Sequence, residues 1–407
     1  MTTSLVETSP ALTASESPKS TNRLQIVDVL RGFALFGILF INVLTFRGPG
    51  HTWTGIDNIV DTLVVILGQG KFVTSFSILF GLSLALQFER VGDKPYLRSY
   101  VRRIAALLMF GVLHFVLLWE GDILMQYVIP GIVLLFFVRR KPRTIALSAA
   151  AFYVLAMAFF SLILIVSASQ RANQPPSSEP PLIPLAAYTH STYGELVSDR
   201  WQALPGFLAE HLISSVFLLY TFLTGLYVAK RGILHHPELH IALITRTFRW
   251  GLPVGLVMNI VSILGLPYRN ALALPLQLIW FFCSITGLIV LALGYLSGMI
   301  LLWLNGGARI RQILTPLAAV GRMSLSNYIL QTIILTTLFY GYGLGWYDQF
   351  TPIQGIIIPI GVYTINLIFS NLWMARFRYG PLEWIWRCIT NWKIQPIAKK
   401  AYAASTT

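Results

Sequence analysis

The sequence predicts an all-α, polytopic integral membrane protein, a helical bundle of about ten transmembrane helices. Of its 407 residues, 55% are hydrophobic and only 11% are charged, whereas roughly 25% of the residues of a soluble domain are charged. The mean hydropathy is +0.67. Apolar stretches of about 20 residues, the length that crosses a hydrocarbon core as a helix, recur along the chain. This composition cannot cover a water-facing surface, so soluble folds are excluded.

Hydropathy places the predicted spans one after another along the chain. They lie near residues 28–46, 63–88, 104–119, 123–138, 144–167, 208–229, 247–267, 274–303, 322–342 and 354–374. Because the number of spans is even, both termini are expected on the same side of the membrane.

Lys and Arg residues gather in alternate loops, and cytoplasmic loops are the ones enriched in them. Two segments predicted to face inward, residues 90–103 and 139–143, are the most strongly basic. The outward loops hold few basic residues, such as Arg47, Arg171, Arg200 and Arg269. The pattern predicts that both termini are cytoplasmic.

The predicted membrane domain spans residues 25–380 and is flanked by two cytoplasmic tails. Residues 1–24 are rich in Ser and Thr and lack the apolar core of a signal peptide, so we expect a disordered tail. Residues 381–407 form the other tail. Residues 168–207 are one long outward loop, whose prolines argue against a globular domain; it could cap an outward-facing site. The loop separates five spans from five, with no visible internal repeat.

The net charge of +14 does not indicate a nucleic-acid partner. The basic residues are spread over loops that flank the membrane, where topology and anionic lipid head groups account for them. The two cysteines, Cys283 and Cys388, lie in an apolar span and in the cytoplasmic tail. They are not expected to meet, so neither a disulfide nor a metal cluster is indicated.

The first span, which begins VDVLRGFALFGILFINVL at residue 27, contains a polar stripe. Asp28 and Arg31 are three residues apart and share one helix face. Asn42 follows Arg31 by eleven residues, about three turns, and returns to the same face roughly 16 Å further on. Two interpretations stay open: an orienting ion pair at a helix end, or Arg31 pointing into a cavity to meet a phosphate or carboxylate.

Lys71 is the cation of the second span, in LGQGKFVTSFSILFGLSLAL. Its side chain either reaches the outer interface along its aliphatic stem or adds a positive charge to the cavity at Arg31. Both interpretations stay open.

Two histidines are candidate bases. His114 and Asp122 lie in GVLHFVLLWEGDILMQYVIPG, at the turn between the third and fourth spans. Asp122 could accept a hydrogen bond from one ring nitrogen so that the other acts as a base. A buried, hydrogen-bonded histidine near the outer interface is the alternative, which the sequence alone favours slightly. His51 lies in the first outward loop, RGPGHTWTGIDNIVD, where histidines are usually solvated. The sequence has no phosphate loop, no HExxH and no GxSxG, so metal and serine-hydrolase chemistry are not indicated.

The stretch DVLRGFALFGILFIN resembles the opening of the YeiB-type family of bacterial membrane proteins. KFVTSFSILFGLSLAL, RRIAALLMFGVLHFVLLWEGDIL, and GRMSLSNYILQT with YGPLEWIWRCIT are similar to later blocks of that family, in the same order. The first helix is in turn similar to that of transmembrane acyltransferases. In the acyltransferase-3 enzymes an Arg is followed eleven residues later by a His. Here these positions hold Arg31 and Asn42, so a base must come from elsewhere.

The resemblance to heparan-α-glucosaminide N-acetyltransferase, which also has Asn there, aligns His51 with the catalytic histidine. His114 instead belongs to a block typical of YeiB-type sequences. The resemblance implies acyl transfer from cytoplasmic acyl-CoA, without a metal, to a hydroxyl or amine of a small-molecule or glycan acceptor near the outer face. Arg31, Arg102 and Arg103 would bind the phosphates, and Asn42 would stabilise the oxyanion.

Other classes of function stay open beside this enzyme. Buried Arg31 and Lys71 could serve a transporter or exporter of an anionic small molecule. A non-catalytic membrane scaffold is the third hypothesis. Membrane lipids are expected partners in each case, and the sequence leaves a homo-oligomer open.

Overall fold

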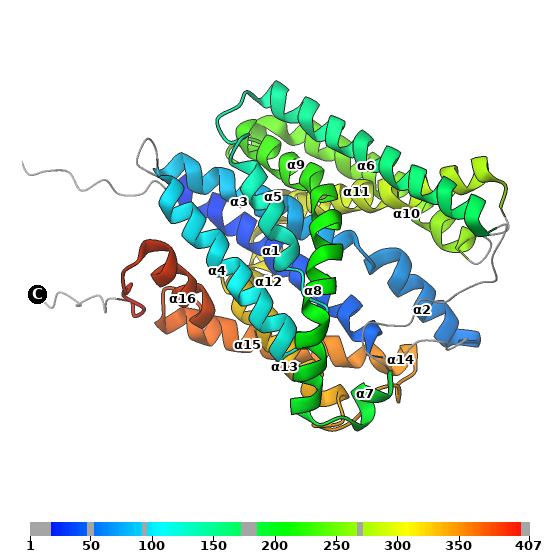
Figure 1. Cartoon of the computed structure of the whole chain (residues 1–407). Coiled ribbons are helices and arrows are strands. Elements are labelled where there is room, and N and C mark those ends of the chain that lie inside the picture. The colour runs from blue at the N-terminus through cyan, green and yellow to red at the C-terminus, as the bar shows by residue number, and fades with distance from the viewer. Residues whose placement is uncertain (1–17, 47–52, 92–95, 172–184, 267–271, 400–407) are drawn as a thin grey trace, which may run out of the picture.

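The computed structural model describes residues 18–46, 53–91, 96–171, 185–266 and 272–399, and these residues fold as an all-α bundle (Figure 1). Within these ranges the strand-like pairing consists of one isolated bridge, between Phe377 and Ala398. The helices are α1 Pro18–Thr45, α2 Gly55–Gly68, α3 Lys71–Val91, α4 Tyr96–Leu117, η1 Met125–Tyr127, α5 Val128–Leu134, α6 Pro142–Arg171, α7 Leu185–His190, α8 Tyr193–Phe217, α9 Leu219–Lys230, η2 Pro237–His240, α10 Ile241–Gly265, α11 Leu274–Asn305, α12 Gly307–Arg322, α13 Ser324–Phe339, α14 Pro352–Gly355, α15 Ile357–Arg376 and α16 Pro381–Asn391.

The bundle is a multi-pass membrane fold. Among the described residues, seven helical segments are long and apolar enough to cross a membrane, and α8 with α9, bent by 42°, gives an eighth. The predicted spans 123–138 and 322–342 are instead short apolar helices, Met125–Leu134 and Ser324–Phe339. At 1.5 Å per residue the 16 residues of α13 reach about 24 Å, less than a 30 Å hydrocarbon core. Helix length alone therefore supports seven or eight spans, and does not confirm ten.

Three segments predicted to be tails or loops contain helix. α1 begins at Pro18, inside the predicted 1–24 tail, and α16 occupies the start of the predicted 381–407 tail. α8 begins at Tyr193, inside the predicted 168–207 loop. The reason for α8 is local: Thr192 and Glu195 form a capping box that starts the helix, and Pro205 is accommodated within it.

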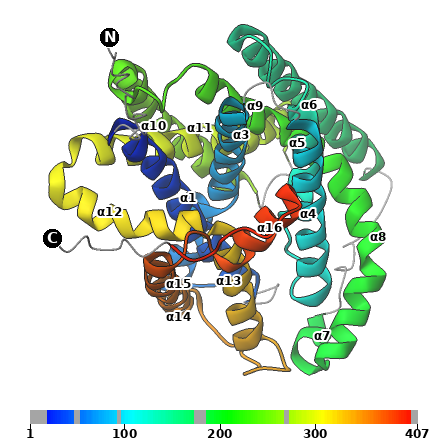
Figure 2. The same cartoon turned by 90° about the vertical axis from the view of Figure 1, so that its left-hand side faces the viewer.

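α1 is the central helix. Figures 1 and 2 show it passing through the middle of the bundle, with α3 on one side and α12 on the other. Its apolar residues Val29, Ala34 and Leu39 are fully buried. α6, α10 and α11 form an outer layer with largely exposed apolar faces, as expected for helices in contact with lipid.

The bundle has two ends. At the first end α1 and α4 begin and α16 lies; at the second end α1 and α4 finish and α7 and α14 lie (Figure 1). In Figure 2, α16 crosses the first end between α4 and α13.

Glycines bring the backbones of α1 and α12 into direct contact. A Cβ on Gly321 would lie 1.8 Å from the carbonyl oxygen of Asp28, and a Cβ on Gly32 would lie 2.2 Å from that of Leu317. Small residues permit such close helix packing in membranes, where dispersion contacts replace the hydrophobic effect. The crossing fixes the rotation of α1 beside the polar stripe.

A carboxylate anchors α16 to α13. Glu383 accepts hydrogen bonds from the backbone N–H of Leu325 (2.7 Å) and of Ser326 (3.0 Å) and from the Ser326 hydroxyl (2.5 Å). These N–H groups belong to the first turn of α13 and have no partner inside that helix. Trp386 adds a second anchor by donating its indole N–H to the carbonyl of Arg103 on α4 at 3.0 Å.

We expect Gly321→Ala to disrupt the α1–α12 crossing, because the added methyl group overlaps backbone rather than a movable side chain. The cost should be about 1–3 kcal/mol or more, seen as a lower unfolding temperature and poor recovery in detergent. Gly361→Ala on α15 is the matched control, since its Cβ would meet nothing within 4 Å. Equal behaviour of the two variants would contradict the close contact.

We expect Glu383→Ala to loosen α16, because it leaves donors at the start of α13 without an acceptor, at a cost of about 1–3 kcal/mol. Faster limited proteolysis after residue 380 and a lower unfolding temperature would report this. Glu238→Ala removes an exposed carboxylate of η2 and should change neither measurement. The prediction is wrong if protease cleaves α16 of the Glu383→Ala variant no faster than α16 of the wild-type protein.

Candidate functional site

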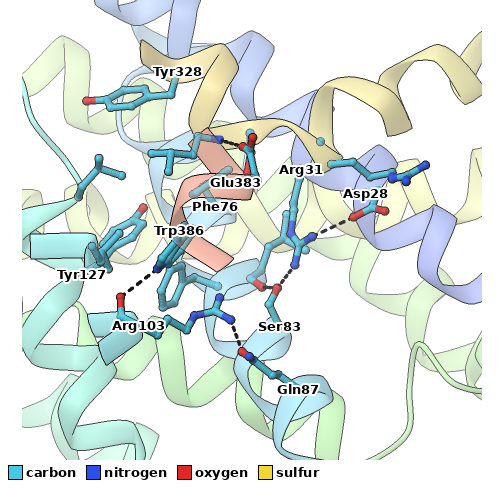
Figure 3. A pocket seen from close by; sticks show the side chains of 18 of the residues that line it. Asp28, Arg31, Phe76, Ser83, Gln87, Arg103, Tyr127, Tyr328, Glu383 and Trp386 are labelled. Carbon is cyan, nitrogen blue, oxygen red and sulfur yellow. Dashed lines mark hydrogen bonds and ion pairs between the residues drawn. The ribbon is translucent and has the colours of Figure 1, made fainter. Parts of the chain in front are cut away.

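A cavity of about 460 Å³ opens at the first end of the bundle. Its walls come from α1, α3, α4, the segment before α5, the α12–α13 junction and α16, so residues far apart in sequence meet there (Figure 3). The polar lining residues include Asp28, Arg31, Ser83, Gln87, Arg103, Tyr127, Arg322, Tyr328, Arg378, Glu383 and Arg387.

The polar part of the wall is predominantly cationic. It holds five arginines, at positions 31, 103, 322, 378 and 387, against two carboxyl groups, Asp28 and Glu383. Burial raises the pKa of the Glu383 carboxyl above its ordinary value, and the hydrogen bonds from Ser326 and Leu325 lower it by less. The wall therefore has an excess of positive charge, which favours an anionic ligand.

The predicted pair on α1 is present and faces the cavity. Arg31 donates to Asp28 Oδ1 at 2.8 Å and also to the hydroxyl of Ser83 on α3 (Figure 3). Arg103 donates to Gln87 Oε1, and its guanidinium lies 4.7 Å from the ring centroid of Trp386. Both interpretations of Arg31 are thus combined: it is paired with Asp28 and it lines a cavity.

Much of the rest of the wall is apolar. Leu35 and Ile38 continue the face of α1 that begins with Arg31, and Phe76, Phe80 and Leu107 lie opposite them. The cavity thus combines arginines with an aliphatic and aromatic surface. It can hold a molecule that has an anionic head and an apolar segment.

Three other predicted binding residues lie outside the cavity wall. Lys71 is 2% exposed and donates from Nζ to the carbonyl of Val65, at the end of α2, at 3.0 Å. The helix is interrupted between α2 and α3 at Gly70, which has a φ of +80°. Lys71 donates a hydrogen bond to a carbonyl at the end of α2 and is not available to a ligand in the cavity. Asn42 lies beyond Ile38, past the end of the α1 face that lines the cavity, and Arg102 on α4 is not among the lining residues.

His114 and Asp122 form the predicted pair, in the interior of the bundle. The ring Nδ1 lies 2.9 Å from Asp122 Oδ2, and Nε2 lies 2.9 Å from Thr332 Oγ1 on α13. Both residues are buried, and Asp122 Oδ1 also accepts the backbone N–H of Met125 at 2.8 Å. The carboxylate can hold the imidazole in one orientation, and Thr332 makes the histidine's second hydrogen bond.

One side chain separates this pair from the cavity. Tyr328 lines the cavity, and its ring lies 4.8 Å from the His114 ring, centroid to centroid. Neither His114 nor Asp122 is itself part of the cavity wall. The other candidate base, His51, lies outside the described residues.

The site contains residues to which the sequence analysis assigned no role. Arg322, Arg378, Glu383 and Arg387 come from the C-terminal part of the chain. Two sequence blocks, GRMSLSN and YGPLEWIWR, lie near these residues. The sequence predicts that most of the second block belongs to a cytoplasmic tail, whereas the structure packs it against α4. Among the described residues no group of three or more His, Cys, Asp or Glu side chains could hold a metal ion.

The comparisons with known proteins agree on one family. Residues 228–393 match the family described as a protein of unknown function, DUF418. The uncharacterized protein YxaH of Bacillus subtilis (strain 168) is 32% identical over 95% of this chain and 99% of its own length. The uncharacterized protein YeiB of Escherichia coli (strain K12) is 30% identical over 89% of this chain and 95% of its own length. No solved structure matches the chain. The protein therefore belongs to the YeiB-like family of multi-pass membrane proteins, the family to which the DUF418 description applies.

Proposed function

We propose that the protein is a membrane acyltransferase that binds an acyl-CoA at the first end of the bundle and passes the acyl group to an acceptor hydroxyl or amine. The observation that carries the proposal is the cavity, in which five arginines adjoin an apolar surface. Acyl-CoA has this chemistry, with phosphates at one end and an acyl chain at the other, and arginine forms strong bidentate hydrogen bonds to phosphate.

The distribution of basic residues supports a cytoplasmic position for the first end. The start of α4, with Arg98, Arg102 and Arg103, and the basic residues 139–143 around the start of α6 lie at this end, and such basic segments stay on the cytoplasmic side. We propose the bacterial inner membrane as the location. The second end would then face outward, and an acceptor would reach the site from there.

His114 supports the catalytic part of the proposal through its geometry. With Asp122 at Nδ1, Nε2 would take the proton of the acceptor hydroxyl or amine, whose oxygen or nitrogen bonds to the thioester carbonyl carbon as the carbon–sulfur bond breaks. The departing CoA thiolate then takes that proton from the imidazolium and leaves as the free thiol. The Thr332 hydroxyl occupies the position at Nε2 that an acceptor would need. Reaction therefore requires Tyr328 and Thr332 to move aside.

A transporter or exporter of an anionic amphipathic molecule is the second candidate. The observation in its favour is that both nitrogens of the His114 ring have hydrogen-bond partners within the protein. In that case the histidine is structural, and the arginine-lined cavity binds cargo rather than a co-substrate.

We expect Arg31→Gln to weaken binding of labelled acyl-CoA by about tenfold or more, because one charge-assisted contact contributes about 1.5–3 kcal/mol. Asp28→Asn should leave binding unchanged or tighter, since it removes the carboxylate that neutralises Arg31. The matched control is Arg309→Gln, an exposed arginine on α12 outside the cavity. Equilibrium binding to purified protein in detergent measures all three. Unaltered binding by Arg31→Gln would count against the cavity as the site.

We expect His114→Gln to abolish acyl transfer while acyl-CoA binding stays within about twofold of wild type, because the ring lies outside the cavity wall. Thr332→Val should retain transfer, since it removes only the hydroxyl that the acceptor must replace at Nε2. Product formation and binding are measured on the same preparations, with the unfolding temperature as the check on folding. Normal acyl transfer by a folded His114→Gln protein would show that His114 is not the base.

A further inference from the structure

A second charged site lies at the opposite end of the bundle, around Arg200. The sequence analysis counted Arg200 as an outward-loop residue, but it belongs to α8 and its exposed fraction is 0%. A guanidinium group stays protonated throughout the pH range in which proteins remain folded, and it carries five N–H donors. Burying it without strong partners costs several kcal/mol, so its surroundings must compensate that charge.

The protein compensates the charge of the buried Arg200 only in part. Arg200 Nε lies 3.5 Å from Glu120 Oε2, longer than the 2.7–2.9 Å of a charge-assisted hydrogen bond. None of the three guanidinium nitrogens makes a hydrogen bond of good geometry. The charged plane instead lies over Tyr340, with 5.4 Å from the guanidinium carbon to the ring centroid. The fork of donors thus has one loosely placed carboxylate as its acceptor.

Glu120 is held by other donors. Its Oε1 accepts the Tyr188 hydroxyl at 2.8 Å, and its Oε2 accepts the Tyr340 hydroxyl at 3.5 Å. The Tyr188 and Tyr340 rings stack at 5.2 Å. The Glu120 side chain is 23% exposed, whereas Arg200 is enclosed. Glu120 therefore connects the buried cation to the surface of the second end.

We infer that Arg200 is the anion-binding residue of a second site, which takes a small oxyanion, a carboxylate or phosphate group, in place of Glu120. A planar guanidinium fork with free donors matches two oxygens of such a group. The tyrosine rings form an aromatic wall, and the incoming anion displaces the partly exposed carboxyl group of Glu120.

The position of this site connects it with the histidine. Glu120 and Asp122 flank Gly121, whose carbonyl accepts the Tyr328 hydroxyl at 3.2 Å. In the proposed acyl transfer, the anion held at Arg200 belongs to the acceptor, which approaches His114 from the side opposite the cavity. That assignment rests on the proposed function; oxyanion binding at Arg200 does not.

The unfolding temperature of the purified full chain tests the inference, in a non-ionic detergent without phospholipid and without acyl-CoA. Sodium acetate and sodium phosphate are titrated against sodium chloride at matched ionic strength. We expect a saturable rise with acetate or phosphate. Arg200→Gln should abolish the rise, and Arg31→Gln should retain it, which separates this site from the arginine-lined cavity. Glu120→Gln should bind the anion about tenfold more tightly, because the competing carboxylate charge is removed.

A further arm of the experiment identifies the source of the oxyanion. If the bound group is a lipid phosphate, adding phosphatidylglycerol to phosphatidylcholine nanodiscs should raise the unfolding temperature of wild type but not of Arg200→Gln. If the bound group is a soluble anion, acetate or phosphate should raise the unfolding temperature without phosphatidylglycerol. The inference is overturned if chloride stabilises as much as acetate and phosphate, or if the rise survives Arg200→Gln. If Arg200→Gln does not fold, the Glu120→Gln variant decides the question. Unchanged or weaker binding of the anion by Glu120→Gln would mean that Arg200 and Glu120 form a structural ion pair only.

Discussion

The close contact between α1 and α12 is the constraint on which the site depends. Gly32 and Gly321 have no Cβ, so the two backbones touch, and no other residue type fits this distance. The contact sets which face of α1 points inward and places the α12–α13 junction beside it. Arg31 then faces Ser83 on α3, while Arg322 and Leu325 close the same space from the other side.

The next requirement is that polar groups inside the membrane find partners within the protein. Lys71 donates to the carbonyl of Val65, and His114 uses both ring nitrogens. Glu383 binds the first N–H groups of α13, which joins the cavity wall to the fold. The two places where positive charge exceeds its partners, the arginine-lined cavity and Arg200, lie at opposite ends of the bundle. Each is therefore a candidate site for an anion.

Sequence spacing predicted the local pairs and failed for the distant ones. Asp28 with Arg31 and His114 with Asp122 are three and eight residues apart, and helix periodicity or one turn brings each pair together. Arg103 was a candidate through its basic segment. Arg378 and Arg387 were not candidates, because only the docking of α16 against α4 and α13 brings them to the cavity. Arg102 and Asn42 do not line the cavity, although each is a suitable residue type on a helix that contributes to its wall.

The sequence by itself determined the membrane class, the helical content and the polar stripe of α1, because hydropathy and helix periodicity act over a few turns. It also indicated the family, through several blocks that resemble those of YeiB-type proteins in the same order. Only the tertiary structure shows that two of the predicted spans form short helices, Met125–Leu134 and Ser324–Phe339. It decided as well that Arg200 is buried beside Glu120, 80 residues away in sequence. Such pairings follow from how helices pack against one another, and composition, spacing and periodicity carry no information about contacts at that separation.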